Sequence, residues 1–456
     1  MDTKVSKLGL LTMSIGGMIG WGAFMQPGLK FLPRAGVLNT MIGMFLGLIM
    51  VGTIASCYGI ILNKSPKSQG GEYSYSKLAF SKAHSFVVGW FLIIVFIGIA
   101  ALNTTSFALI FKNVLYPNAD FITLYSIAGS PVTLGEILIS IAVIGTFSWL
   151  ILRGVRSVIV VQNIVTIALI IIVFAIFFMA MFSVDLSNSP FMTYMDAGQI
   201  NLKAIISILV ITPWAYYGVS NIPKVASDAK LPYKQVISIT VLSLICGFFI
   251  YQMLLLLTAT KFSAETLVGY KGWATGDAIL SLFGKTGLFF ITIGLAFAIF
   301  SGVNSFYMGA ARVMSSMSED GLLSSAFSKK HPKYGTPYIS IFFILAIVIA
   351  APFFGRQVLT WIVDMSALGG ALVFFYTAFT AYRISAGFEK IVGLVATIFS
   401  VVFLALLVIP GSPGFLSGPS IIALVVWSIL GVVLYHLDAK KANWSNQEVA
   451  ESVSSL

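Results

Sequence analysis

Two short segments of the chain combine residues that interrupt a helix with residues able to bind a small solute. One is Gly16-Gly17-Met18-Ile19-Gly20-Trp21-Gly22, and the other is Thr212-Pro213-Trp214-Ala215-Tyr216-Tyr217-Gly218. In a helix interior each glycine costs about 1 kcal/mol and a proline about 3 kcal/mol. A helix interrupted in this way leaves N–H and carbonyl groups without partners, and such groups bind polar or charged ligands.

The backbone groups at these segments match the two charges of an amino acid. A carboxylate suits the N–H groups of a half-helix that begins at Trp21 and Gly22, and an ammonium suits unwound carbonyl groups. No acidic or basic residue stands beside either segment in the sequence, so binding would rest on the backbone. Close helix packing through the glycines, with the rings in the core, is an open alternative. The predicted substrate site comprises Ile19, Gly20, Trp21, Gly22, Trp214, Ala215, Tyr216, Tyr217 and Gly218.

Side chains that support catalysis or bind metals are few and scattered. Cys57 and Cys246 lie in separate apolar runs, and His84, His331 and His436 lie far apart. Metal sites and acid–base catalysis need such residues to converge. The sequence therefore favours a protein that is not an enzyme and holds no metal or cofactor, apart from a sodium ion or a proton as coupling ion.

The composition places the two segments in a membrane. Of 456 residues, 58% are hydrophobic and only 9% are charged, against about 25% charged residues in soluble domains. A soluble core stops growing near ~300 residues, so a chain this apolar needs lipid to cover its surface. The net charge of +11 is spread over short loops, which argues against nucleic acid as a partner. The expected partners are a lipid bilayer and a small-molecule substrate, with no obligate protein partner.

Apolar runs of about 20 residues, the length that crosses a bilayer, recur along the whole chain. The N-terminal run exceeds a signal-peptide core and is interpreted as a retained span. We expect one polytopic domain over residues 1–456. Its twelve spans are 8–31, 38–62, 86–111, 133–152, 157–183, 203–224, 235–260, 286–316, 338–355, 357–383, 391–410 and 419–437.

Spans 1 and 6 carry the two interrupted segments and run in opposite directions. This is typical of an inverted five-plus-five repeat, with halves at 8–183 and 203–383 and two further helices at 391–437. The predicted fold class is therefore an all-α membrane protein with twelve transmembrane helices, of which helices 1 and 6 are broken. With the N-terminus inside, 19 of the 27 Lys and Arg residues lie on that side. The positive-inside rule thus places both termini in the cytoplasm, with the chain in the plasma membrane.

Four motifs occur in the same order as in a known group of permeases. They are Gly17-Met18-Ile19-Gly20-Trp21-Gly22-Ala23-Phe24; Tyr58 with residues 66–75; Trp214 to Gly218 with residues 228–232; and Arg312 to Leu323 with residues 331–337. In these the chain resembles the amino acid–polyamine–organocation superfamily. The resemblance implies secondary active transport of amino acids, as a symporter or exchanger, by alternating access. Small organic amines such as ethanolamine or polyamines are the alternative, although such an amine would call for an acid at the site.

Two departures from the family pattern bear on substrate size and on coupling. Trp21 stands where the family has a small Ser or Thr, so the indole is expected to narrow the site. Leu169 stands where many members have a lysine whose ammonium replaces a sodium ion. Asn304 and Ser305 resemble a segment that supplies sodium ligands in fold-related symporters, and carbonyl groups near Gly17 would add more oxygens. Sodium-stimulated transport is one expectation, and passive exchange or another proton route stays open.

Two polar positions inside apolar runs stand apart from the interrupted segments. Asp364 is the acid placed deepest in such a run, which makes it a functional candidate, although pairing with Arg356 would explain it equally well. Asn103 in span 3 would either face the pocket or bond to neighbouring helices. A channel would show a pore-lining repeat or a ring of charge, and the sequence has neither.

Overall fold

The computed structural model describes residues 6–65, 71–111, 122–127, 130–153, 155–183, 189–196, 199–223, 231–270 and 272–441. Within these ranges the side chains at 109, 130, 155–159, 195–196, 356–360 and 438–441 are not part of the description. The motif residues 66–70 and 228–230 and the side chain of Arg356, the expected partner of Asp364, therefore lie outside the described part.

Helices make up most of the described chain. The first half contains α1 (Lys7–Met18), α2 (Trp21–Gln26), the π-helix η1 (Pro27–Phe31), α3 (Leu32–Lys64), α4 (Glu72–Ser76), α5 (Lys82–Ile110), α6 (Leu134–Arg153), α7 (Val155–Ser183), α8 (Pro190–Asp196), α9 (Leu202–Leu209), α10 (Thr212–Ala215) and the 3₁₀ helix η4 (Tyr217–Ser220). The second half contains α12 (Tyr233–Ala259), α13 (Ala264–Leu267), α14 (Ala274–Glu319), η5 (Ser325–Ser328), α15 (Tyr338–Ala350), η6 (Ala351–Phe354), α16 (Gly355–Ile384), α17 (Gly387–Val408) and α18 (Gly418–Lys441).

Ten helices of the described chain are long and apolar enough to cross a membrane, where the sequence predicted twelve spans. The difference lies in two places. The first expected span is divided into α1, α2 and η1, so α1 is too short to count by itself. The ninth is the shorter apolar helix Tyr338–Phe354. The chain is thus a multi-pass membrane protein.

The described chain is helical as the sequence predicted, and a short β-hairpin that the sequence did not predict lies between α5 and α6. Strand β1 (Thr123–Ile127) pairs antiparallel with β2 (Ser130–Thr133). The Tyr125 hydroxyl donates to the carbonyl oxygen of Phe353 at 2.6 Å, which ties the hairpin to η6. A hairpin this short is marginal by itself, so its contact with the bundle contributes to its stability.

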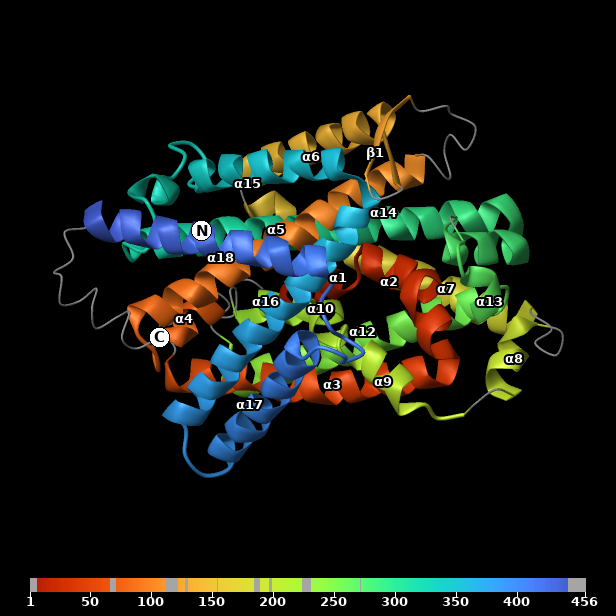
Figure 1. Ribbon diagram of the computed structural model, residues 1–456, viewed down its shortest axis with the longest axis horizontal. Helices are drawn as coiled ribbons and strands as arrows, with labels where there is room; N and C mark the ends of the chain where they lie inside the picture. Colours follow the sequence, from red (N-terminus) through yellow and green to blue (C-terminus); the bar gives the residue numbers. More distant parts are fainter. Residues whose placement is uncertain are drawn as a thin grey trace.

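The helices differ in how deeply they lie in the bundle. In Figure 1, α3, α5 and α14 run along the long axis of the molecule, while α6 and α15 lie together along one edge. In its most apolar window α5 is 83% buried, whereas α18 is only 22% buried and lies at the periphery of the bundle. The rings of Trp90 on α5 and Trp427 on α18 stack with centroids 4.3 Å apart. Each indole N–H also donates to the other residue's carbonyl oxygen, at 2.9 and 3.2 Å.

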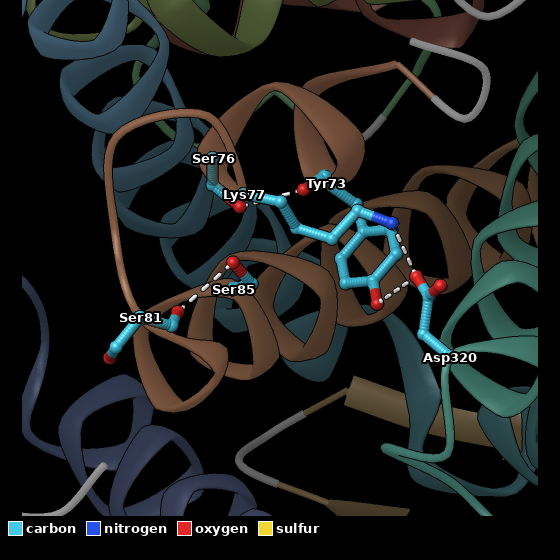
Figure 2. A network of polar contacts seen from close by, with 6 residues as sticks. All are labelled: Tyr73, Ser76, Lys77, Ser81, Ser85 and Asp320. Atoms are coloured by element: carbon cyan, nitrogen blue, oxygen red, sulfur yellow. Dashed lines mark hydrogen bonds and ion pairs between the residues drawn. The ribbon is translucent and has the colours of Figure 1, made fainter. Parts of the chain in front are cut away.

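The short helix α4 is attached to the end of α14 by an ionic contact, which Figure 2 shows from close by. One oxygen of Asp320 accepts from the Tyr73 hydroxyl at 2.7 Å and pairs with the Lys77 ammonium at 2.5 Å. Burial, together with the bond to Asp320, raises the pKa of Tyr73, so its hydroxyl stays protonated and donates. The two charged side chains are about 40% exposed, and the tyrosine supplies the buried part of this attachment.

Helix α1 and the 3₁₀ helix η4 touch through backbone, and Gly218 is the residue that permits this. A Cβ atom added at Gly218 would lie 2.3 Å from the backbone nitrogen of Met18 and 2.4 Å from the carbonyl oxygen of Ser14. Backbone atoms cannot move aside as a flexible side chain can. The two segments that the sequence singled out are therefore packed directly on each other.

We predict that Gly218→Ala lowers the free energy of unfolding by about 1–3 kcal/mol, because overpacking at a rigid contact forces backbone shifts. Thermal unfolding of the detergent-purified protein measures this. Gly145→Ala is the matched control, since a Cβ at Gly145 on α6 meets nothing within 4 Å and alanine is the better helix former. Equal unfolding temperatures for the two variants would contradict the prediction.

Candidate functional site

The first interruption lies at Ile19 and Gly20, within the glycine-rich segment. Helix α1 ends at Met18, Ile19 has φ −93° and ψ 83°, and Gly20 is extended with φ −112° and ψ −158°. Helix α2 then begins at Trp21. The Tyr251 hydroxyl of α12 donates to the carbonyl oxygen of Met18 at 3.3 Å. A neighbouring helix thus satisfies one of the acceptors that the end of α1 leaves free.

Asn103 on α5 binds the backbone at the start of α2, on the other side of this interruption. Its Oδ1 accepts the Trp21 N–H at 3.0 Å, and its Nδ2 donates to the carbonyl oxygen of Ile99 at 2.8 Å. The side chain is 3% exposed. Asn103 therefore acts as the N-cap of α2 from another helix, a role that capping residues normally fill from within the chain. From the sequence, Asn103 was expected to stand apart from the interrupted segments. In the structure its side chain is bonded to Trp21 at the first interruption.

The second interruption is milder, because local groups replace the missing hydrogen bonds. Pro213 has no N–H for the carbonyl of Leu209, and the Thr212 hydroxyl donates to that oxygen at 2.7 Å instead. The turn at Val210 and Ile211 joins α9 to α10, and Tyr216 (φ −97°, ψ 10°) joins α10 to η4. The segment is a helix tightened into 3₁₀ geometry rather than fully unwound.

The two interrupted segments meet at Gly22 and Trp214. A Cβ on Gly22 would lie 2.2 Å from the Trp214 ring, so the indole rests on the first turn of α2. The Nε1 atoms of Trp21 and Trp214 are both buried, and neither has a hydrogen-bond partner in the described chain. An indole N–H can only donate, and leaving it unpaired costs about 1–3 kcal/mol. Each of these two indole N–H groups could therefore donate to a ligand with acceptor atoms.

The remaining predicted site residues are buried around this junction. Ile19, Tyr216 and Tyr217 have no exposed surface, and Ala215 is 2% exposed. The Tyr216 hydroxyl donates to the carbonyl oxygen of Met44 at 3.2 Å. The ring of Tyr217 packs against Phe374 on α16, with centroids 5.3 Å apart. Tyr217 thus has a packing role in addition to any contact with a ligand.

The residues predicted to bind a coupling ion are divided between two environments. Asn304 donates to the side-chain oxygen of Gln162 at 3.2 Å, and the Gln162 amide donates to Ser301. Ser305 is buried, and its hydroxyl has no partner in the described part of the chain. Leu169 is fully buried in the apolar core. Gln162 was not among the residues predicted from the sequence to bind a coupling ion. Its polar amide within the apolar run of α7 could have indicated it.

Gly17 lies against Gly218 of the second segment, and an acidic residue lies beside η4, which continues that segment. A Cβ on Gly17 would lie 3.1 Å from Gly218. One oxygen of the fully buried Glu72 accepts from the Tyr58 hydroxyl at 3.0 Å and from the Ser220 hydroxyl of η4. The expectation that no acid stands beside either interruption was therefore wrong. The chain folds α4 back against η4. Because the two helices are far apart in the sequence, this contact could not be predicted from it.

The comparison with known families decides the class of protein. The family model for amino acid permeases matches residues 6–434, almost the whole chain. The chain belongs to the amino acid permease family. The resemblance seen in the four sequence motifs is thereby confirmed, and the permease has relatives over its full length.

Three relatives indicate what this permease is similar to. The methylthioribose transporter of Bacillus subtilis is 24% identical over 97% of the permease and 95% of its own length. The arginine/agmatine antiporter of Chlamydia felis is 24% identical over 85% and 79%. The branched-chain amino acid permease of Bacillus subtilis is 21% identical over 94% and 93%. These relatives are named as transporters, and their names cover different substrates.

We predict that Asn103→Ala lowers the free energy of unfolding by about 1 kcal/mol, since it removes the cap of α2. It should also reduce uptake, because Trp21 then loses its fixed position. Uptake in whole cells and thermal unfolding of the purified permease measure the two effects. Thr105→Ala is the matched control, because within the described residues the Thr105 hydroxyl bonds only to carbonyl groups of its own helix. If both variants transport equally well, Asn103 does not hold the site.

Proposed function

We propose that the permease is a secondary active transporter of amino acids that works by alternating access. The observation that carries the proposal is that Trp21 and Trp214, one on each of the two interrupted segments, both have a buried indole N–H group without a partner in the described chain. We assign the substrate carboxylate to these donors and to the N-terminal end of α2. The ammonium is assigned to the carbonyl groups of Ile19 and, across the junction, of Ala215 and Tyr217.

The proposed architecture is the twelve-helix inverted repeat, with both termini on the cytoplasmic side of the plasma membrane. In it, α1 and α2 form broken helix 1, whereas α9, α10 and η4 form broken helix 6. The direct contact between Gly218 and the backbone of α1 supports this pairing. Alternating access would then move these segments relative to the helices around them.

A second candidate substrate is a small organic amine, and Glu72 is the observation that favours it. An amine without a carboxylate calls for an acid near the site. Glu72 offers one beside η4, and its second oxygen has no partner in the described chain. The relative named an arginine/agmatine antiporter is consistent with either candidate.

Counter-flow in proteoliposomes tests the proposed function. Vesicles preloaded with one unlabelled solute are given the same solute in labelled form, over a panel of amino acids, small amines and methylthioribose. We expect preloading with an amino acid to accelerate labelled uptake, because a carrier must return through its other state. Acceleration by amines alone would favour the second candidate. Preloading without effect for every amino acid would contradict amino acid transport.

We propose sodium as the coupling ion, with Asn304 and Ser305 as ligands. The buried, unpaired Ser305 hydroxyl is an oxygen donor of the kind that an alkali cation takes. At constant pH, replacing sodium by choline should then reduce uptake severalfold, and Ser305→Ala should abolish the difference. Ser315→Ala, another hydroxyl on α14, serves as the control. Uptake that is indifferent to the replacement would exclude sodium coupling.

A further inference from the structure

A small charged cavity opens beside the second interrupted segment, outside the site already described. Its volume is about 180 Å³. The cavity is lined from four directions: the end of η1 and the start of α3, the turn before α10, helix α16, and the connection between α17 and α18. Lining residues that carry the argument are Lys30, Arg34, Val210, Ile211, Asp364 and Ser417.

The cavity contains two positive side chains and one negative one. Within the described chain, neither Lys30 nor Arg34 forms an ion pair or a hydrogen bond. Asp364 is held in place, because its Oδ2 accepts from the hydroxyls of Ser417 at 3.3 Å and Ser420 at 2.9 Å. The charges that act on Lys30 are those of Asp364 and Arg34. Opposite charges thus share one cavity without closing an ion pair across it.

The position of the cavity connects it with the proposed transport site. Val210 and Ile211 form the turn between α9 and α10, and the next residues of the chain lead directly to Trp214. The same cavity is lined by Asp364 of α16, the helix against which Tyr217 packs. A solute bound here would therefore contact the turn that leads directly into α10 and Trp214, at the junction of the interrupted segments.

The volume and charges together define the ligand. A water molecule occupies about 30 Å³, so the cavity holds about six waters, or a solute of roughly six to nine non-hydrogen atoms. Two cations suit a carboxylate, and a fixed carboxylate suits an ammonium. A neutral sugar would leave all three charges unpaired, and a simple amine would meet two like charges.

We propose that this cavity, the Lys30–Asp364 vestibule, is a second binding site for small zwitterionic amino acids. Lys30 and Arg34 bind the carboxylate, and Asp364 binds the ammonium. The inference rests on the proposed function, since it supplies that transport site with its substrate. It also adds selectivity, because both charged ends of an amino acid are recognised before the solute reaches the interrupted helices.

The transport test compares an amino acid with the amine that lacks its carboxylate. The probes are L-leucine with isopentylamine and L-valine with isobutylamine, both small zwitterionic amino acids with their decarboxylated amines. For the double variant Lys30→Gln/Arg34→Gln we expect the KM of the amino acid to rise about three- to tenfold, as for partly exposed ion pairs. The KM of the amine should not rise, and kcat should change little. Asp364→Asn should raise the KM of both members of a pair, because both carry the ammonium.

Two controls keep the transport result specific. Lys285→Gln removes an exposed positive charge outside the cavity and should leave every KM unchanged, whereas Lys30→Arg retains the charge and should behave as the parent does. The proposal of a vestibule site would be contradicted if Lys30→Gln/Arg34→Gln changed the KM of the amino acid and of the amine equally. A KM change of the same size in Lys285→Gln would also contradict it.

A binding test separates failure of the vestibule from failure of the proposed function. Gly22→Leu fills the junction of the interrupted segments, so L-leucine and L-valine at millimolar concentration should still raise the unfolding temperature through the vestibule alone. Adding Lys30→Gln/Arg34→Gln should remove that increase. An increase that persists in the triple variant overturns the vestibule, as does its absence in Gly22→Leu protein that folds as the parent does. Loss of counter-flow with every amino acid would instead overturn the transport function.

Discussion

In lipid a helix can be interrupted only where other groups of the protein take over the hydrogen bonds of its backbone. Three side chains fulfil this condition in the permease. Asn103 accepts the N–H of Trp21, Tyr251 donates to the carbonyl of Met18, and Thr212 donates to the carbonyl of Leu209. These bonds connect α5 to the start of α2 and α12 to the end of α1. The indole N–H groups of Trp21 and Trp214 remain unpaired in the described chain, and for this reason we propose them as donors to the substrate.

Local chemistry explains what the sequence predicted well. The long apolar helices follow from the exclusion of water, which acts on every residue of a run and needs no knowledge of neighbours. The interruption at Ile19 and Gly20 follows from the glycines, whose cost in a helix is a local property. The division of the ninth expected span has a local cause too, since Pro352 lies where α15 gives way to η6.

Contacts between distant segments explain what the sequence did not predict. Glu72 stands far from residues 212–218 in the chain, and only the return of α4 onto η4 brings it to Ser220. Gln162 and Asn304 are separated by 142 positions and share one hydrogen bond. The role of Asn103 depends in the same way on the approach of α5 to α2. Such pairings are set by how whole helices pack, and no pattern within one helix specifies them.

The two peripheral attachments of the bundle differ in their physical nature, and this has a consequence for the response to electrolyte. The Trp90–Trp427 stack that fixes α18 contains no charge, so ionic strength hardly affects it. The Lys77–Asp320 pair that holds α4 is about 40% exposed, so mobile ions screen it. A concentrated salt solution therefore weakens the Lys77–Asp320 pair, while the buried hydrogen bonds of α4 and the stack that fixes α18 are little affected.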